Sequence, residues 1–260
     1  MSNNSILSFI SDIHVKTNDD ENYRLLLEFL KSDEVMYSDE VFLLGDIFDL
    51  MIGAHSEYFE YYNEFFSSLK RLINLGKKVH FFEGNHDFHL KKLFDRYLSR
   101  EGLNHQQFIY HKGIFVEKYG NRKLVICHGD EIEIGNYTYK IYNFIIRSRV
   151  LRFIANYIIS FNLLNKIGRY MSDTSRAHGE GFYENKQDEI RSSSRISAIC
   201  SAKKFNADMV VCGHTHILEN YHFDTEQVTY LNCGYLPQTK GFFHLNNGEI
   251  RFVDISTTSK

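Results

Sequence analysis

The sequence has no tryptophan, only one proline in 260 residues and no long apolar run, and each shortage excludes a class of protein. The longest uncharged apolar stretch, Phe153–Leu164, is well short of the ~20 residues that a helix needs to cross a bilayer. No repeat or low-complexity tract is visible, so disordered and fibrous architectures are excluded. We therefore expect an ordinary globular protein without a membrane-spanning helix.

Excess charge, paired cysteines and a leader segment are also missing. Lys and Arg number 30 against 33 Asp and Glu, and the formal net charge of −3 argues against a dedicated nucleic-acid-binding protein. Four cysteines form no C-x-x-C pair, so neither a disulfide framework nor a zinc ribbon is predicted. The first residues lack the basic and apolar segments of a secretory signal. These features predict a cytoplasmic protein.

Short apolar, β-branched or aromatic runs recur along the chain and predict mostly buried strands. They cover Ile6–Ile10, Val41–Leu44, Val79–Phe82, Lys123–Cys127, Met209–Cys212, Val228–Leu231, Phe242–Leu245 and Ile250–Val253. Helical patterns at Glu21–Lys31 and Glu57–Leu75 separate the first three strands, and Ser56 and Gly76 fit the two ends of the second helix. Residues 246–248 predict a tight turn between the last two strands. The pattern indicates an α/β fold with mixed sheets.

One segment does not follow this alternation of strands and helices. From Ile134 to Ser172 there is no Asp or Glu, while lysines and arginines punctuate a run rich in Ile, Leu, Phe and Tyr. We predict a single domain over residues 1–260 with a helical insertion, or cap, at about residues 131–190. This composition has two interpretations. The insertion either forms an apolar groove for acyl chains, with cations beside it for phosphates, or is a helical subdomain whose apolar face packs on the body of the protein. The groove would be lined by Arg147, Arg149, Arg152, Ile146, Leu151 and Phe153.

Side chains of metal-ligating type follow five of the predicted strands. The segments are Asp12-Ile13-His14, Gly45-Asp46-Ile47-Phe48-Asp49, Gly84-Asn85-His86-Asp87, His128-Gly129-Asp130 and Gly213-His214-Thr215-His216. Ligands of α/β sheets collect at the carboxyl ends of strands, so we expect these segments to meet. Oxygen and imidazole donors without a thiolate suit manganese, iron, zinc or cobalt, and seven of them suit two ions that share a carboxylate.

Together the five segments resemble the signature of the calcineurin-like metallophosphoesterases, namely D-x-H, G-D-x-x-D, G-N-H-D, a later histidine after a strand, and G-H-x-H. The resemblance implies a four-layer αββα sandwich. It also implies two divalent ions, expected to be Mn²⁺, one held by Asp12, His14, Asp46 and His216 and the other by Asp46, Asn85, His128 and His214. His86 would contact the phosphoryl group and protonate the leaving oxygen, and Asp87 would orient His86.

A closer resemblance runs through most of the chain, to the UDP-2,3-diacylglucosamine hydrolases of bacterial lipid A synthesis. It is carried by the segments Gly45–Gly53, Glu83–Phe88, His128–Glu131 and Leu231–Tyr235, and by an apolar, basic insertion after the H-G-D motif. The resemblance implies hydrolysis of the pyrophosphate of UDP-2,3-diacylglucosamine to UMP and 2,3-diacylglucosamine 1-phosphate. It also implies a peripheral location on the anionic inner face of the bacterial inner membrane.

Two alternatives remain open at this level. The same chemistry would serve a soluble phosphodiester or phosphomonoester, and the scaffold also suits a lipid- or protein-binding module. Every ligand position of the signature is filled, which favours an enzyme over a binding module. Turnover of a lipid substrate compared with a soluble ester would separate the two enzymes.

Overall fold

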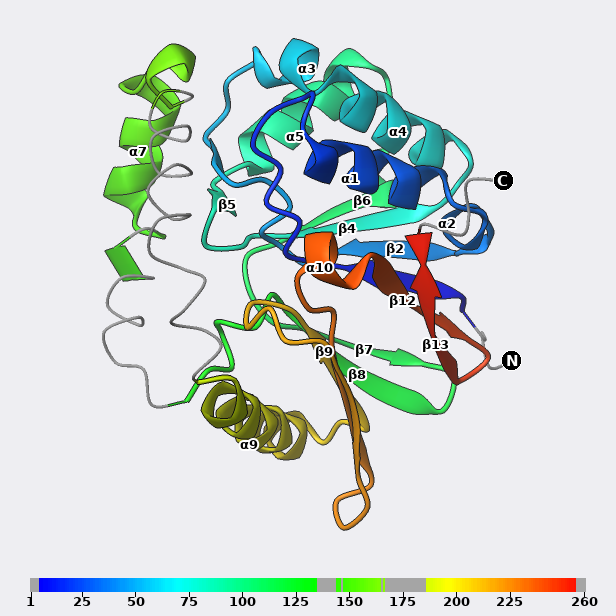
Figure 1. Ribbon diagram of the computed structural model, residues 1–260. Coiled ribbons are helices and arrows are strands. Elements are labelled where there is room, and N and C mark those ends of the chain that lie inside the picture. Colours follow the sequence, from blue (N-terminus) through cyan, green and yellow to red (C-terminus); the bar gives the residue numbers. More distant parts are fainter. Residues whose placement is uncertain (1–4, 135–143, 146, 165, 167–185, 256–260) are drawn as a thin grey trace.

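Two β-sheets form the centre of the molecule (Figure 1). The computed structural model describes residues 5–134, 144–145, 147–164, 166 and 186–255. The six-stranded sheet has the order β13-β12-β1-β2-β4-β6, and the five-stranded sheet has the order β10-β11-β9-β8-β7. The first sheet contains β1 (Leu7–Ile10), β2 (Glu40–Leu43), β4 (Lys78–Phe82), β6 (Phe108–His111), β12 (Gly241–Asn246) and β13 (Glu249–Asp254). The second contains β7 (Phe115–Tyr119), β8 (Arg122–Ile126), β9 (Met209–Cys212), β10 (Glu219–Phe223) and β11 (Val228–Asn232).

Helices cover the outer face of each sheet. The named helices of the described residues are α1 (Glu21–Lys31), α2 (Asp33–Tyr37), α3 (Tyr58–Tyr61), α4 (Asn63–Asn74), α5 (Lys91–Arg100), α7 (Arg149–Tyr157), α9 (Gln187–Phe205) and α10 (Leu236–Thr239), with a 3₁₀ turn at His105–Gln107. Figure 1 shows α1, α4 and α5 over the six-stranded sheet and α9 beneath the other. Two short strands, β3 (Met51–Ile52) and β5 (Asp87–Phe88), pair separately.

The core divides into three apolar clusters because successive strand residues point to opposite faces. On β2, Val41 and Leu43 pack against the helices, whereas Phe42 faces the second sheet. On β9, Val211 belongs to the cluster between the sheets and Val210 to the cluster beneath α9. Each sheet is therefore buried on both faces, and the αββα order expected from the resemblance is confirmed.

The predicted helix at residues 57–75 is instead two helices. Tyr62 interrupts it with φ −114° and ψ 44°, and α3 begins after Glu57 without a side-chain cap, so the prediction of Ser56 as N-cap was wrong. The Tyr62 ring is buried against Tyr23 and Phe48, with centroids 5.6 and 4.6 Å away, and this packing overrides the helical periodicity. The predicted C-terminal end is confirmed, since Gly76 has φ 79°.

The eight predicted strands are all present, but the pattern did not reveal the short pair β3 and β5, nor the longer strands β6, β7 and β10. β6, β7 and β10 lie at the edges of the two large sheets, where one side of the strand has no neighbour. Their side chains are accordingly half-buried or exposed over much of their length. The predicted turn at residues 246–248 is confirmed as the antiparallel connection between β12 and β13.

The described part of the insertion contains α7, which lies along one side of the molecule (Figure 1). Its buried Ala155 contacts the body, where the Ala155 carbonyl oxygen lies 2.9 Å from His55 Nε2. The Phe161 ring packs edge-on against Tyr58, with centroids 5.0 Å apart. The predicted insertion extends to about residue 190, and α9 begins at Gln187. Among the residues that the structure describes, no helix has the length and apolar character needed to cross a membrane.

A buried polar network lies at the edge of the interface between the sheets. His80 Nε2 is 3.0 Å from Glu40 Oε2, and His80 Nδ1 is 2.9 Å from His111 Nε2. Tyr119 donates to the same Glu40 oxygen from the second sheet, at 2.7 Å. Burial and the neighbouring His80 lower the pKa of His111 to about 3, and burial also lowers the pKa of His80. Both rings are therefore neutral in the folded protein at pH 7.

This network predicts acid sensitivity of the fold. An unfolded histidine has a pKa near 6.5, so the stability contributed by neutral His111 is complete above about pH 6.5 and falls as the pH approaches 3. His111→Gln should flatten the pH dependence of the unfolding free energy in this range, by at most about 1.4 kcal/mol per pH unit. Urea unfolding in the presence of a chelator, repeated across this pH range, measures the unfolding free energy. The exposed variant His222→Gln is the control. Equal slopes in both variants would contradict the assignment.

Candidate metal centre

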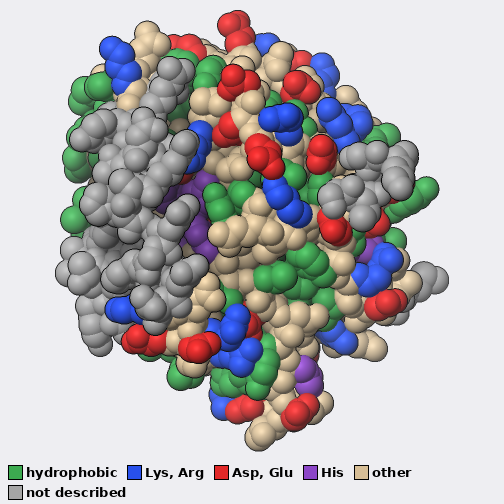
Figure 2. All heavy atoms as spheres, in the orientation of Figure 1, with side chains coloured by type: hydrophobic (Ala, Val, Ile, Leu, Met, Phe, Trp, Pro, Cys, Tyr) green, Lys and Arg blue, Asp and Glu red, His purple; other side chains and the backbone are tan. Residues whose placement is uncertain are grey.

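The five segments singled out in the sequence follow the carboxyl ends of parallel strands. They come after β1, β2 and β4 of the first sheet, and after β8 and β9 of the second. The two sheets pack face to face, so these ends lie at one edge of the sandwich. Figure 2 shows histidine side chains gathered in a hollow on this side of the molecule.

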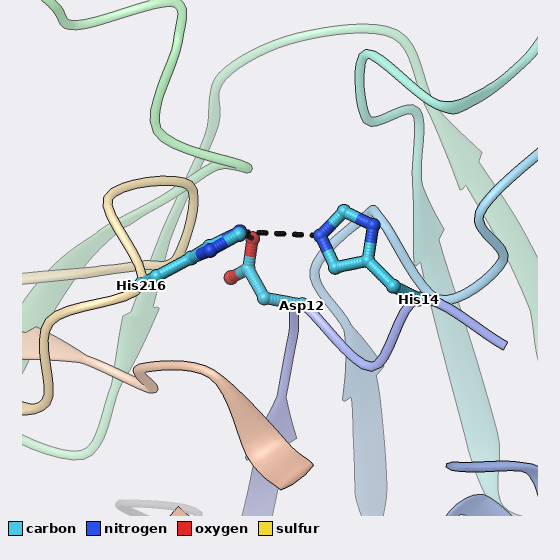
Figure 3. A group of neighbouring side chains, drawn as sticks. All are labelled: Asp12, His14 and His216. Atoms are coloured by element: carbon cyan, nitrogen blue, oxygen red, sulfur yellow. Dashed lines mark hydrogen bonds and ion pairs between the residues drawn. The ribbon is translucent and has the colours of Figure 1, made fainter. Parts of the chain in front are cut away.

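Asp12, His14 and His216 form one group of donors (Figure 3). His14 Nε2 lies 3.1 Å from His216 Nε2, and His216 Nε2 lies 3.4 Å from Asp12 Oδ1. Asp12 is fully buried, and its other oxygen accepts from the Ser11 hydroxyl and from the His214 backbone N–H. Residues from the loop after β1 and from the loop after β9, about 200 positions apart in the chain, thus share one pocket.

Asp46 and His128 belong to a second group, with Asp12 as its third member. Asp46 Oδ2 lies 3.4 Å from His128 Nε2 and 3.8 Å from His14 Nε2, so this single oxygen reaches both groups. The Asn85 side-chain oxygen is 3.1 Å from His128 Nε2. His128 Nδ1 lies 2.8 Å from the Leu44 carbonyl oxygen, which can only accept, so Nδ1 carries the proton. Nε2 then faces Asp46 Oδ2 and Asn85, and it is the ring nitrogen that can bind a metal once it is deprotonated.

His214 lies beside the second group, with its ring centroid 5.1 Å from that of His128. Its Nε2 is 3.5 Å from Glu133 Oε2. His14, Asp49 and His86 form a third group, in which Asp49 Oδ1 is 3.5 Å from His14 Nδ1. The structure therefore brings all seven sequence-predicted ligand residues to one place.

The chemistry of this arrangement suits divalent cations. Asp12 Oδ1 is a buried acceptor without a hydrogen-bond partner, and His14 and His216 direct two ring nitrogens at each other. Burial lowers the pKa of His14, which keeps its ring neutral. Burial would raise the pKa of Asp46, but His128, His86 and His14 hold it well below its usual value. Two carboxylates beside several imidazoles in a buried site form a strong cation-binding environment.

Most of these residues adopt an uncommon backbone conformation. Left-handed φ angles occur at Asp12 (50°), His14 (51°), Asp46 (52°), His214 (71°) and His216 (60°). Non-glycine residues rarely occupy this region, and each instance costs on the order of 1–3 kcal/mol. Five such residues in one site indicate that the surrounding structure holds their backbone in a conformation that these residues would not adopt on their own.

Two glycines allow the loops to approach the carboxylates closely. A Cβ at Gly84 would collide with Asp46 Oδ1, and a Cβ at Gly213 would collide with Asp12 Oδ2 and the Ser11 hydroxyl. These glycines precede Asn85 and His214 directly, so the motif glycines are required by the packing around the two carboxylates.

The sequence interpretation of Asp87 as the residue that orients His86 was wrong in its geometry. The buried Asp87 carboxylate accepts from four backbone N–H groups, those of Asp46, Ile47, Phe48 and Gly84, at 2.7–3.2 Å. His86 Nδ1 instead lies 2.9 Å from the Asp49 carbonyl oxygen. Asp87 faces the backbone because four buried donors there need an acceptor.

Sequence reasoning did not assign a role to Asn232 or Tyr235. The buried Asn232 amide donates to the Gly213 carbonyl at 2.7 Å and to the Thr215 hydroxyl at 3.0 Å, which supports the G-H-T-H loop. The Tyr235 ring stacks on His216, with centroids 5.1 Å apart. Their position at and just after the end of β11, parallel to β9, was the available signal.

The residues predicted to line an acyl groove do not form one surface. Arg147 Nη2 lies 2.9 Å from the buried Asp130 Oδ2, so its charge is directed into the protein. Arg149, Arg152 and Phe153 line a separate pocket of about 430 Å³. Leu151 is half-buried on α7, and Ile146 lies outside the described residues.

The chain is similar to known proteins in sequence. Residues 7–218 match the family described as calcineurin-like phosphoesterase. Proteins named UDP-2,3-diacylglucosamine hydrolase are similar, at 24% identity in Vibrio atlanticus (85% of this chain, 84% of the relative). The relative from Histophilus somni is 24% identical over 94% of this chain and 98% of its own length. The relative from Yersinia pseudotuberculosis is 27% identical over 80% of each chain.

Solved structures with a similar fold include an archaeal phosphodiesterase, at 15% identity and TM-score 0.45, over 95% of this chain and 98% of that one. Another is a single mutant of Vps29 from Entamoeba histolytica, also at 15% identity and TM-score 0.45, over 95% and 97% of the two chains.

The geometry predicts that Asp46 is required for metal binding. Asp46→Asn keeps an acceptor for the His86 backbone N–H but removes the charge that reaches both donor groups. Mn²⁺ should raise the Tm of the wild type and have little effect on the variant, because a ligand stabilises only the state that binds it. Elemental analysis should find less metal in Asp46→Asn and an unchanged amount in the exposed control Asp19→Asn. Equal metal content in all three proteins would contradict this role.

Proposed function

The chain belongs to the calcineurin-like phosphoesterase family and is a metal-dependent phosphoester hydrolase, and from this premise we propose that it hydrolyses the pyrophosphate of UDP-2,3-diacylglucosamine. The products would be UMP and 2,3-diacylglucosamine 1-phosphate. The observation that carries the proposal is the similarity to hydrolases of that name over 80–94% of the chain. An apolar helix exposed on one side of the molecule supports a lipid substrate.

Members of the family use two divalent cations, and we assign their ligands in this chain from the two donor groups. One cation would be held by Asp12, His14, Asp46 and His216, and the other by Asp46, Asn85, His128 and His214. When bound, the cations polarise the phosphoryl oxygen and activate the attacking water. We expect Mn²⁺, because the donors are carboxylates, an amide oxygen and imidazoles without a thiolate.

His86 is assigned as the group that protonates the leaving oxygen. Its ring lies edge-on to that of His14, with centroids 4.8 Å apart, so it borders the donor groups. The Asp49 carbonyl oxygen accepts from His86 Nδ1 and fixes the ring, which leaves Nε2 to hold the proton that the leaving oxygen takes up. Asp87 acts indirectly, because it positions the backbone of both Asp46 and Gly84.

Acyl chains are assigned to the exposed side of α7 and the residues that flank it. Large apolar side chains there are open to solvent, and they comprise Phe144, Ile145, Val150, Phe153, Tyr157 and Ile158. Each methylene that moves from water to such a surface contributes about 0.8 kcal/mol, so two long chains supply much of the substrate affinity. The same side chains, beside Arg149 and Arg152, fit peripheral attachment to the anionic inner face of a bacterial membrane.

The assignment of His86 predicts a loss of rate without a loss of metal. His86→Ala should reduce kcat by roughly 10²–10⁴-fold for an ester whose leaving group needs a proton, and less for an activated p-nitrophenyl ester. Hydrolysis rates and elemental analysis on the same preparation measure both effects. The control is His222→Ala, at an exposed histidine of β10. A variant that lost an equivalent of metal would show that His86 is a ligand.

The assignment of α7 predicts a substrate-selective defect. Phe153 is 57% exposed, so Phe153→Ser should leave the fold intact and lower kcat/KM for micellar UDP-2,3-diacylglucosamine about tenfold or more. The kcat/KM for bis(p-nitrophenyl) phosphate should not change. Tyr37→Ser, at a 75% exposed aromatic residue on α2, is the control. Parallel losses for both substrates, or no hydrolysis of the lipid by the wild type, would favour a soluble phosphoester as substrate.

A further inference from the structure

A second pocket lies between α7, the first turn of α5 and the turn that joins β6 to β7. Its volume of about 430 Å³ falls in the range typical of small-molecule sites. The lining residues are His89, Lys91, Lys92, Asp95, Lys112, Arg149, Arg152, Phe153, Asn156 and Tyr157. Among them there is none of the seven assigned metal ligands, so the pocket is separate from the metal centre.

The pocket carries an unbalanced positive charge. Five of its lining side chains are Lys or Arg, and Asp95 is the only carboxylate among those that the structure describes. Asp95 is engaged by Lys91, with Nζ 2.7 and 2.9 Å from its two oxygens. Within the described residues, no carboxylate lies within ion-pair distance of Lys112, Arg149 or Arg152, whereas Arg147 on the same segment is paired with Asp130. Within the described residues, the pocket therefore concentrates three cations that have no carboxylate partner.

Two helices begin at this pocket with basic residues in their first turns. α5 starts with Lys91 and Lys92, and its N-cap residue Leu90 supplies no side-chain acceptor. α7 starts with Arg149 and also has no acidic residue in its first turn. The N-terminus of a helix carries partial positive charge, so cations there are unfavourable unless an anion is bound nearby. At α7 the N-cap Ser148 accepts from the Leu151 N–H, whereas α5 has no such cap. Both first turns contribute basic side chains to the pocket lining, which supports anion binding there.

The remaining wall of the pocket is aromatic. The rings of Phe153 and Tyr157 are adjacent, with centroids 5.1 Å apart. Lys92 Nζ lies 4.6 Å from the centre of the Tyr157 ring and 2.7 Å from its hydroxyl. This contact holds the ammonium group of Lys92 beside the aromatic wall of the pocket. The Asn156 amide donates one N–H to the Arg152 carbonyl oxygen at 2.6 Å, so only its second N–H can reach a ligand oxygen.

We propose that this pocket binds a phosphoryl group of a small ligand at a site distinct from the metal centre. Arg149 and Arg152 can each present paired N–H donors to phosphate oxygens, while Lys92 and Lys112 act as point charges. The phosphoryl group belongs either to a soluble phosphate compound or to the headgroup of an anionic lipid, and both offer the same oxygens. The site does not depend on which ester the metal centre hydrolyses.

The test uses the full-length, metal-loaded protein and methylene diphosphonate, a diphosphate analogue that cannot be hydrolysed. Isothermal titration should show one more binding event in the wild type than in Arg149→Gln/Arg152→Gln. The matched control, Lys203→Gln/Lys204→Gln, removes two exposed cations from α9 and should bind like the wild type. The metal centre is common to all three proteins, so its own affinity for the probe cancels in the comparison. Circular dichroism and Tm verify that each variant is folded.

A second arm identifies the source of the phosphoryl group. Sedimentation with phosphatidylcholine vesicles, with and without phosphatidylglycerol, reports binding to a lipid headgroup. A loss of at least tenfold in affinity for anionic vesicles in the pocket variant alone, without an extra diphosphonate site, would identify a lipid. The reverse result would identify a soluble phosphate compound. Equal behaviour of the pocket and control variants in both assays would overturn the proposal, whether or not the protein hydrolyses the lipid ester.

Discussion

The buried carboxylate of Asp87 is the interaction on which the rest of the candidate metal centre depends. It accepts from the backbone N–H groups of Asp46, Ile47, Phe48 and Gly84, and so joins the loop after β2 to the loop after β4. Without it, these buried donors would lack partners, at a cost of about 1–3 kcal/mol each. Because Asp46 is one of the four, the carboxylate that reaches both donor groups is placed by Asp87.

The second sheet contributes its half of the site through a similar arrangement. Asn232 supports the loop after β9 with two donated hydrogen bonds, and Asp12 accepts from the His214 backbone, which connects the two sheets directly. The apolar cluster between the sheets then sets the distance between their loop edges. The metal centre is thus formed only when the two sheets are packed together, and no single supersecondary unit contains it.

The sequence allowed the central strands and the meeting of the five segments to be predicted, because apolar runs mark buried strands and parallel strands share an edge. It did not reveal β6, β7 and β10, which lie at three of the four edges of the two large sheets, since β7 and β10 lack a continuous apolar face. The role of Asp87 could not be inferred either, because its partners are backbone groups, which leave no trace in the side-chain pattern. Arg147 was grouped with Arg149 and Arg152 by proximity in the chain, although a difference of a few positions directs it to Asp130 instead.

At the left-handed positions of the site, the residue that would best stabilise the fold is not the residue that activity requires. At His216, with φ 60°, glycine would relieve the backbone and remove the imidazole, so the replacement that suits the chain best abolishes the donor. Selection for stability alone would therefore erode this loop, and the side chains that persist there record selection for what they bind. A homologue with glycine at several of these positions would be expected to fold more stably and to have given up its metal.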